Sequence, residues 1–183
     1  MKNLILEGFM GCGKTSVSKA LSERLRIPLY DTDLRIEEKN GLSISEIFER
    51  SGEEAFRDME TAELEELTRS RERMIISLGG GMPVREENRR LLKKLGTVFY
   101  LKAPFDLLYE RLSKKEEGEN RPMLKDHELM GRIKSLLKER EEAYLAAADF
   151  TLAVSGDMSV EDVVFAVRKA GGYEDTCDQR TQS

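Results

Sequence analysis

The sequence contains no tryptophan, and aromatic residues make up only 7% of its 183 positions. It also lacks an excess of basic residues, since the net charge is -5. A nucleic-acid-binding surface needs a basic stripe and usually aromatic platforms for the bases, so this composition counts against such a partner. With 39% hydrophobic and 36% charged residues, the chain has the composition of a globular protein, and its length suits one domain.

Cysteine is scarce, because only Cys12 and Cys177 are present. One lies in a glycine-rich loop and the other in a polar tail, so they do not form a disulfide framework, which is typical of a reducing compartment. Long hydrophobic runs are absent as well. None approaches the roughly 18 residues of a membrane span, and the start of the chain does not resemble a signal peptide. We therefore expect a cytoplasmic monomer with no membrane or nucleic-acid partner.

Near its beginning the sequence contains the stretch GFMGCGKTS, from Gly8 to Ser16. Gly8 is followed by four residues and then by Gly13, Lys14 and Thr15. This spacing matches the phosphate-binding P-loop, whose backbone N–H groups and lysine contact nucleotide phosphates. The motif needs a strand before it and a helix after it, and the flanking patterns indicate both. The alternative is a glycine-rich turn that binds nothing. The P-loop interpretation makes Thr15 a ligand of Mg²⁺. It assigns nucleotide binding to Gly11, Cys12, Gly13, Lys14, Thr15 and Ser16.

Short apolar runs alternate with longer amphipathic stretches along the chain. This alternation predicts an α/β fold, a five-stranded parallel sheet flanked by helices on both faces, in a single domain over residues 1–172. The clearest predicted helix begins after a Ser159 cap, has valines at i, i+3, i+4 and i+7 from Val160, and ends at two glycines. The predicted strands lie near Leu4, Leu29, Ile75, Val98 and Thr151.

Three segments do not follow this alternation. Residues 33–72 are predicted to form a helical region that covers a pocket and binds a substrate, because they contain a long helical pattern with no strand. Residues 113–125, SKKEEGENRPMLK, are interpreted as a mobile lid that closes over phosphates, with an ordinary surface linker as the alternative. Residues 173–183 are polar and are predicted to be a disordered tail.

Two aspartates follow the second predicted strand. Motors and switches with a P-loop normally take a metal-binding carboxylate from the end of another strand. Here the candidate strand, the apolar run from Met74 to Leu78, has Ser77 near its end and no aspartate. The candidates are instead Asp31 and Asp33, which share a face if their segment is extended. They would divide the binding of Mg²⁺ and of a substrate hydroxyl, as in phosphoryl transfer to an alcohol. The alternative is a helix cap in which Thr32 or Asp33 accepts backbone N–H bonds.

Three consecutive glycines, Gly79, Gly80 and Gly81, follow an apolar run. They form either a loose turn or a place where a ligand approaches the backbone directly. The presence of a P-loop in the same chain favours the second interpretation, so we assign these glycines to the substrate site.

Taken together, these motifs resemble those of shikimate kinases. In the family's order, the chain contains GFMGCGKTS, DTD, IFERSGEEAFRDME, SLGGGMPV, the pair Arg121-Pro122 and LLKEREEAY, between Asn3 and about Lys169. The resemblance implies a P-loop kinase fold related to nucleoside monophosphate kinases, with ATP and Mg²⁺ as cofactors. It also implies phosphorylation of the 3-hydroxyl of shikimate, a step in the biosynthesis of chorismate and aromatic amino acids.

The resemblance further implies roles for residues around the substrate. Asp33 would hold the reacting hydroxyl and act as the base. Arg57 and Arg140 would bind the shikimate carboxylate, which suits a planar guanidinium that offers two parallel N–H bonds. Backbone and aromatic contacts to the substrate ring would come from Gly79, Gly80, Gly81, Phe48 and Phe56.

Other implied roles concern the nucleotide. Lys14 and Arg121 would act on the phosphates, Arg121 from the lid, and Arg111 would lie against adenine. Asp31 would help organise Mg²⁺. Cys12 departs from the family pattern, which more often has alanine or serine there, and an exposed thiol at this position would make the enzyme sensitive to thiol reagents.

Two other classes of function share the P-loop. A kinase for another small acceptor, such as gluconate or a nucleoside monophosphate, shares the fold as well. Nucleotide kinases should have an Asp-Gly-x-Pro-Arg-like stretch where this chain has SLGGGMPV. A guanine-nucleotide switch needs Asp-x-x-Gly and Asn-Lys-x-Asp, and neither occurs in the sequence.

Overall fold

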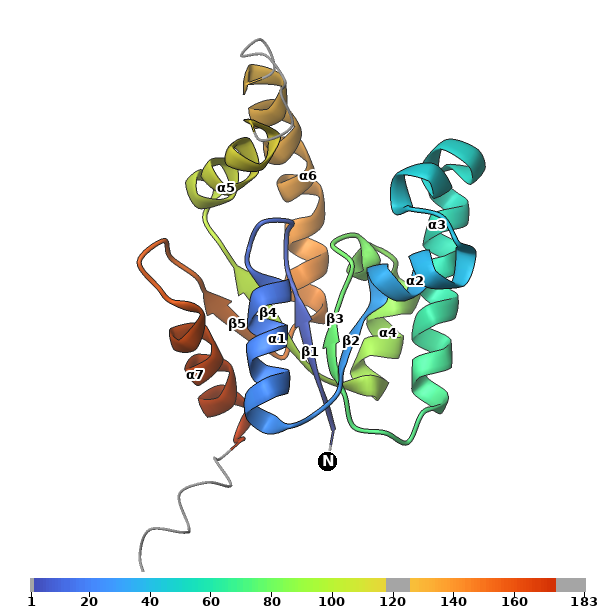
Figure 1. Ribbon diagram of the computed structural model, residues 1–183, viewed down its shortest axis with the longest axis vertical. Coiled ribbons are helices and arrows are strands. Elements are labelled where there is room, and N and C mark those ends of the chain that lie inside the picture. Colours follow the sequence, from blue (N-terminus) through green and yellow to red (C-terminus); the bar gives the residue numbers. More distant parts are fainter. Residues whose placement is uncertain (1, 118–125, 174–183) are drawn as a thin grey trace, which may run out of the picture.

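The computed structural model describes residues 2–117 and 126–173, which form one sheet with helices on both of its faces (Figure 1). Its five strands are all parallel and lie in the order β2-β3-β1-β4-β5. The strands are β1 Asn3–Glu7, β2 Leu29–Asp31, β3 Ile75–Ser77, β4 Gly96–Lys102 and β5 Phe150–Ala153. The predicted five-stranded parallel sheet is therefore confirmed.

Helices connect successive strands and pack on the two faces of the sheet. Helices α1 and α7 lie on one face, while α4 and α6 lie on the other, with α3 packed against α4 and α5 against α6. The helices are α1 Lys14–Leu25, α2 Thr32–Asn40, α3 Ile44–Arg69, the 3-10 turn η1 Met82–Val84, α4 Glu86–Leu95, α5 Phe105–Glu117, α6 Asp126–Ala147 and α7 Val160–Gly171. The predicted Ser159 cap of α7 is confirmed.

The central strand β1 is buried on both faces. Because side chains of a strand alternate between the two faces of a sheet, Leu4 and Leu6 pack with Val17 of α1, whereas Ile5 packs with Leu92 of α4. This double burial explains why β1 is a continuous apolar run in the sequence rather than an alternating one. It also places the P-loop, which follows β1, in the middle of the carboxyl edge of the sheet.

The predicted helical region 33–72 consists of α2 and α3. Gly41 ends α2 with a φ of 64°, and Ser43 begins α3 through a capping box with Glu46. Within α3, Gly52 has a φ of 81° and a ψ of 172°, so the long helix kinks there. The first part of α3 consequently projects past the carboxyl ends of the strands (Figure 1).

Part of the predicted lid and almost all of the predicted tail lie outside the described residues. Helix α5 continues to Glu117, so residues 113–117 are helical. Residues 118–125, with Arg121, and residues 174–183, with Cys177, are not among those described. In the part of the chain that is described, no helix has the length and apolar character needed to cross a membrane. The lid and the tail stay predictions.

Candidate active site

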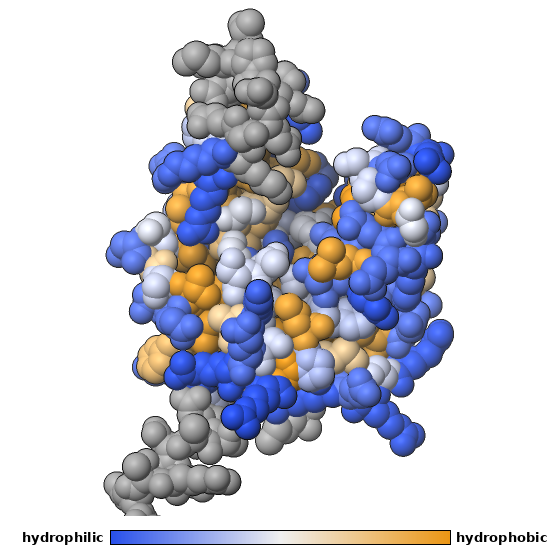
Figure 2. All heavy atoms as spheres, viewed as in Figure 1, coloured by the Kyte–Doolittle hydropathy of each residue, from blue (hydrophilic) through white to orange (hydrophobic). Residues whose placement is uncertain are grey.

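A cleft opens at the carboxyl edge of the sheet, and Figure 2 shows this side of the molecule notched between two lobes. The cavity has a volume of about 670 Å³ and is lined from the β1–α1 loop, the ends of β2 and β3, α5, α6 and the β5–α7 loop. Ligands of open parallel sheets bind at this edge. The lining includes the expected residues Gly11, Cys12, Gly13, Lys14, Thr15, Ser16, Asp31, Asp33, Gly80, Arg111 and Arg140.

The P-loop has the backbone that phosphate binding requires. Gly8 and Gly13 have φ values of 145° and 100°, where side chains are rarely accommodated, and a Cβ on Gly8 would lie 2.7 Å from the carbonyl oxygen of Leu101. Lys14 bends back over the loop, where its Nζ donates to the carbonyl oxygens of Gly8 at 2.7 Å and Phe9 at 3.2 Å. Its ammonium group therefore lies beside the N-terminus of α1, which attracts phosphate groups.

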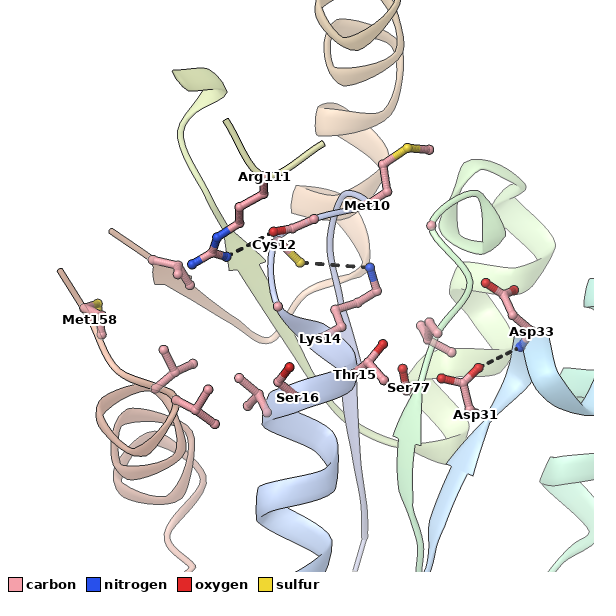
Figure 3. Close-up of a pocket in the computed structure, with 18 of the residues that line it drawn as sticks. Met10, Cys12, Lys14, Thr15, Ser16, Asp31, Asp33, Ser77, Arg111 and Met158 are labelled. Atoms are coloured by element: carbon pink, nitrogen blue, oxygen red, sulfur yellow. Dashed lines mark hydrogen bonds between the residues drawn. The ribbon is translucent and has the colours of Figure 1, made fainter. Parts of the chain in front are cut away.

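Cys12 lies in this loop with its thiol in the protein core. The side chain is 2% exposed, and its Sγ lies 3.9 Å from Lys14 Nζ, as drawn in Figure 3. A Cβ on Gly8 would lie 2.9 Å from this sulfur, so the missing side chain of Gly8 makes room for it. We expected sensitivity to thiol reagents only if the thiol of Cys12 were exposed, and in the structure it is buried.

The acidic pair lies at the turn from β2 to α2 (Figure 3). Asp31 caps α2, since its Oδ1 accepts N–H bonds from the next residues, including Asp33 at 3.1 Å. The buried hydroxyl of Thr32 instead donates to the carbonyl oxygen of Ser77 at 3.3 Å and accepts from the N–H of Gly79 at 2.9 Å. The helix-cap interpretation thus holds for Asp31, and not for Thr32 or Asp33 as the sequence suggested.

Asp33 lies in the first turn of α2, so the expected extended geometry of the pair is wrong. Both carboxylates nevertheless line the cavity. Burial, followed by the negative charge of Asp31, raises the pKa of Asp33 to about 6, whereas Lys14 lowers it. Asp33 is therefore mostly ionised at neutral pH, yet it accepts a proton more readily than an exposed aspartate does.

The consecutive glycines lie between β3 and η1, and neighbouring side chains occupy the space that a Cβ would need. A Cβ on Gly79 would lie 2.3 Å from Oδ1 of Asp33, and a Cβ on Gly81 would lie 2.1 Å from Nη1 of Arg57. The loose-turn alternative does not account for this packing. A side chain at either position would displace the end of Asp33 or Arg57, because both lie directly against the glycine backbone.

The middle glycine is contacted from α6. The carbonyl oxygen of Gly80 accepts hydrogen bonds from Nη1 of Arg140 at 3.4 Å and from the hydroxyl of Tyr144. Asp33, Arg57 and Arg140 therefore approach the same short stretch of backbone from three different helices. One carboxylate and two guanidinium groups next to a P-loop can bind an acidic molecule that also carries a hydroxyl.

Arg57 is held by two carboxylates of its own helix. Its Nη1 donates to Oε2 of Glu60 at 2.7 Å, and its Nη2 donates to Oε1 of Glu53 at 2.9 Å. Glu60 is itself buried, and burial raises its pKa while the charge of Arg57 lowers it. Glu60 was not expected from the sequence, although its spacing of three residues from Arg57 places both on one helix face. It fixes the guanidinium against Gly81.

The two phenylalanines of α3 contact each other, with ring centroids 4.8 Å apart. Phe56 is in the core and Phe48 is at the surface, and neither lines the cavity. The guanidinium of Arg57 lies 5.7 Å from the centroid of the Phe56 ring, so this ring supports Arg57. That either phenylalanine contacts the substrate stays a prediction.

The other end of the cavity lies across the P-loop from the acidic pair. There Arg111 donates from Nη1 to the carbonyl oxygen of Gly11 at 3.0 Å, and Figure 3 shows it on the same side as Met158. Met158, from the β5–α7 loop, and Val160, the first residue of α7, line this end and were not expected from the sequence. No local pattern marks them, because only the packing of α7 against α1 brings their loop to the cavity. An apolar wall facing a guanidinium suits a flat aromatic base.

Comparisons with known proteins point to one family. The family model for shikimate kinase matches residues 10–169. The shikimate kinase of Thermodesulfovibrio yellowstonii is 41% identical over 169 residues, covering 92% of this chain and 94% of the relative. That of Geobacter metallireducens is 43% identical over 164 residues, covering 90% and 88%. The structure of shikimate kinase from Acinetobacter baumannii in complex with shikimate has a TM-score of 0.81 at 35% identity, covering 93% and 92%.

A more distant likeness bears on the gluconate alternative. A gluconokinase from Sinorhizobium meliloti has a TM-score of 0.55 and 17% identity, over 93% of this chain and 94% of that one. At such identity the likeness shows a shared fold alone. The shikimate kinases, in contrast, match in sequence over most of both chains. This chain therefore belongs to the shikimate kinase family, and it is an ATP-dependent small-molecule kinase.

Proposed function

We propose that this chain transfers the γ-phosphoryl group of ATP to the 3-hydroxyl of shikimate, which gives shikimate 3-phosphate and ADP. The observation that carries the proposal is the arrangement at the three glycines, where Asp33, Arg57 and Arg140 approach one backbone segment beside the P-loop. Shikimate presents a carboxylate and ring hydroxyls. Two guanidinium groups and one carboxylate offer complementary partners to both.

The acceptor is oriented by its carboxylate. Arg57 and Arg140 bind this group through parallel N–H bonds, since a planar guanidinium matches a carboxylate. Arg140 lines the cavity and makes a long bond of 3.4 Å to Gly80, so its other donors remain available. With the ring held in this way, Asp33 accepts the proton of the reacting hydroxyl as its oxygen attacks the terminal phosphorus.

ATP is held by the P-loop, with Lys14 on its phosphates. The cavity also suits Mg²⁺: the Thr15 hydroxyl and the Asp31 carboxylate both line it, and the helix cap uses only Oδ1 of Asp31. Within residues 2–117 and 126–173 no cluster of three His, Cys, Asp or Glu forms a closed metal site. Mg²⁺ commonly takes few protein ligands and completes its shell with water and phosphate oxygens, and when bound it neutralises phosphate charge.

The remaining roles extend the family resemblance. Arg111 would lie against adenine, and its position at the apolar end of the cavity supports this. Arg121 would contact the phosphates from a lid over residues 113–125. We further propose that the chain acts as a monomer in the cytoplasm.

An assay of ADP formation tests the proposal. The purified chain is incubated with ATP and Mg²⁺ alone, and then with shikimate, gluconate or a nucleoside monophosphate. We expect ADP only with shikimate, matched by an equal amount of shikimate 3-phosphate. ADP formed without any acceptor would favour a nucleotide-dependent switch, and turnover of gluconate in place of shikimate would favour the other acceptor class.

Gly81→Ala is expected to raise the KM for shikimate by about tenfold or more, since charged hydrogen bonds contribute about 1.5–3 kcal/mol. The new Cβ would take the place of Arg57 Nη1, and Glu60 restricts where that guanidinium can move. Steady-state kinetics measures the effect. Gly80→Ala is the matched variant, because its Cβ would meet no atom closer than 3.7 Å, and a smaller increase is expected. An unchanged KM in Gly81→Ala would contradict the role of Arg57.

A further inference from the structure

The carbonyl oxygen of Gly80 has two side-chain donors, and both come from α6. Arg140 and Tyr144 are four residues apart, so they lie on the same helix face one turn from each other. Arg140 donates from Nη1 at 3.4 Å, and Tyr144 donates from its hydroxyl. Arg140 is a predicted ligand of the substrate. Tyr144 has no role in the chemistry described above.

The two donors differ in how firmly they are placed. The Arg140 bond is long for an N–H···O hydrogen bond, and its guanidinium lines the cavity. Tyr144 is fully buried, and its ring packs on that of Tyr100 with centroids 5.1 Å apart. Burial raises the pKa of Tyr144, so its hydroxyl stays protonated across the pH range of an enzyme assay. The core therefore fixes the tyrosine donor, whereas Arg140 is available to a ligand.

The glycine segment needs such outside support, because glycine has no side chain that would fix its backbone. Its first N–H group, on Gly79, donates to Thr32 Oγ1 at 2.9 Å, and the carbonyl oxygen of Gly79 accepts from the N–H of Met82 at 3.1 Å. At the other end, the carbonyl oxygen of Gly81 accepts from the N–H of Val84 at 3.1 Å, so both ends of the segment are secured. The peptide group between Gly80 and Gly81 depends on the two donors from α6.

We propose that Tyr144 is a positioning residue for the acceptor: its hydroxyl holds the Gly80 carbonyl, so that Arg140 can turn to the substrate carboxylate without the glycine segment changing shape. This inference rests on the proposed function of Arg140. Without the hydroxyl, Arg140 is the remaining side-chain donor to Gly80, and when Arg140 turns to the acceptor this half-buried carbonyl loses that donor as well. Removal of the Tyr144 hydroxyl should therefore weaken acceptor binding and leave nucleotide binding unchanged.

Tyr144→Phe tests the proposal, with Tyr100→Phe as the matched control from the same ring pair. We expect Tyr144→Phe to raise the KM for shikimate roughly three- to tenfold, the equivalent of one neutral hydrogen bond, with the KM for ATP unchanged. Tyr100→Phe should change neither value. An unchanged KM for shikimate, or an equal rise in both KM values, would overturn the proposal, because the second result indicates a general structural role.

A second measurement needs no substitution and covers the case in which Tyr144→Phe does not fold. In the wild-type protein, a slowly exchanging tyrosine hydroxyl proton with a nuclear Overhauser contact to the Tyr100 ring should be visible by NMR and persist at saturating shikimate. Its loss on shikimate binding would overturn the proposal. If the wild type used a different hydroxy acid, the proposed function would fail, and the same comparison of KM values with that acceptor would still decide the role of Tyr144.

Discussion

Asp33→Asn should lower kcat by about two to four orders of magnitude while leaving the affinity for ATP unchanged, which is the range expected for loss of a general base. Asparagine has the shape of aspartate, so it fits the space beside Gly79 where Asp33 Oδ1 lies. It removes the group that accepts the hydroxyl proton and leaves the P-loop intact. Steady-state kinetics measures kcat, and nucleotide titration measures the affinity.

Asp31→Asn is the matched control for this prediction. Asparagine caps a helix as well as aspartate does, so α2 should keep its N-terminus. We expect a smaller loss of kcat, together with a higher Mg²⁺ concentration for half-maximal activity. If Asp33→Asn kept more than about a tenth of the wild-type kcat, a general base would have to lie elsewhere.

Glu7→Gln should stabilise the protein at neutral and alkaline pH. Glu7 ends the central strand, is 1% exposed, and neither carboxylate oxygen has a hydrogen-bond partner among the described residues. Burial, opposed by Lys14 and assisted by Asp149, raises its pKa from 4.5 to about 9. Between these two values the folded chain keeps a proton that the unfolded chain has released. The contribution of Glu7 to the free energy of unfolding is therefore complete below pH 4.5 and is lost as pH rises towards 9.

The test compares the free energy of unfolding of Glu7→Gln and wild type in urea at several pH values. Because one pKa unit corresponds to about 1.4 kcal/mol, the variant should gain roughly 2–4 kcal/mol over the wild type between pH 5 and pH 8. The two proteins should converge near pH 4.5. Glu23→Gln, on the exposed face of α1, should change stability by less than about 0.5 kcal/mol at any pH. A difference that does not vary with pH would contradict the raised pKa of Glu7.

Local sequence patterns were sufficient for the fold and for the P-loop. The apolar runs at β1 and β4 and the valine repeat of α7 follow the periods of strands and helices, so they specify elements without reference to distant residues. The P-loop could be recognised from the sequence for a related reason. Its glycines and Lys14 are contiguous, and the backbone conformation they need is a local property.

The two arginines of the acceptor end could be assigned only through family resemblance, because they come from separate elements. Arg57 and Arg140 each lie in a charge-rich helix, and no spacing in the sequence distinguishes them from solvated arginines. The structure brings them to one stretch of glycines through contacts of α3 and α6 with η1. Asp31 illustrates the converse case. Its role as the cap of α2 is local, but the sequence offered Thr32 and Asp33 as the candidates, and the structure begins the helix earlier than either of them requires.

By itself the sequence determined a five-stranded P-loop fold, the position of the P-loop in it and membership of the shikimate kinase family. The tertiary structure decided which polar groups are buried and what they face: Glu60 holds Arg57, Tyr144 holds the Gly80 carbonyl, and the Glu7 carboxylate has no hydrogen-bond partner among the described residues. Secondary-structure periodicity acts over neighbouring residues, so it can be read along the chain. Burial and the distance between side chains depend on how remote elements pack, and a single sequence does not contain that information in any local pattern.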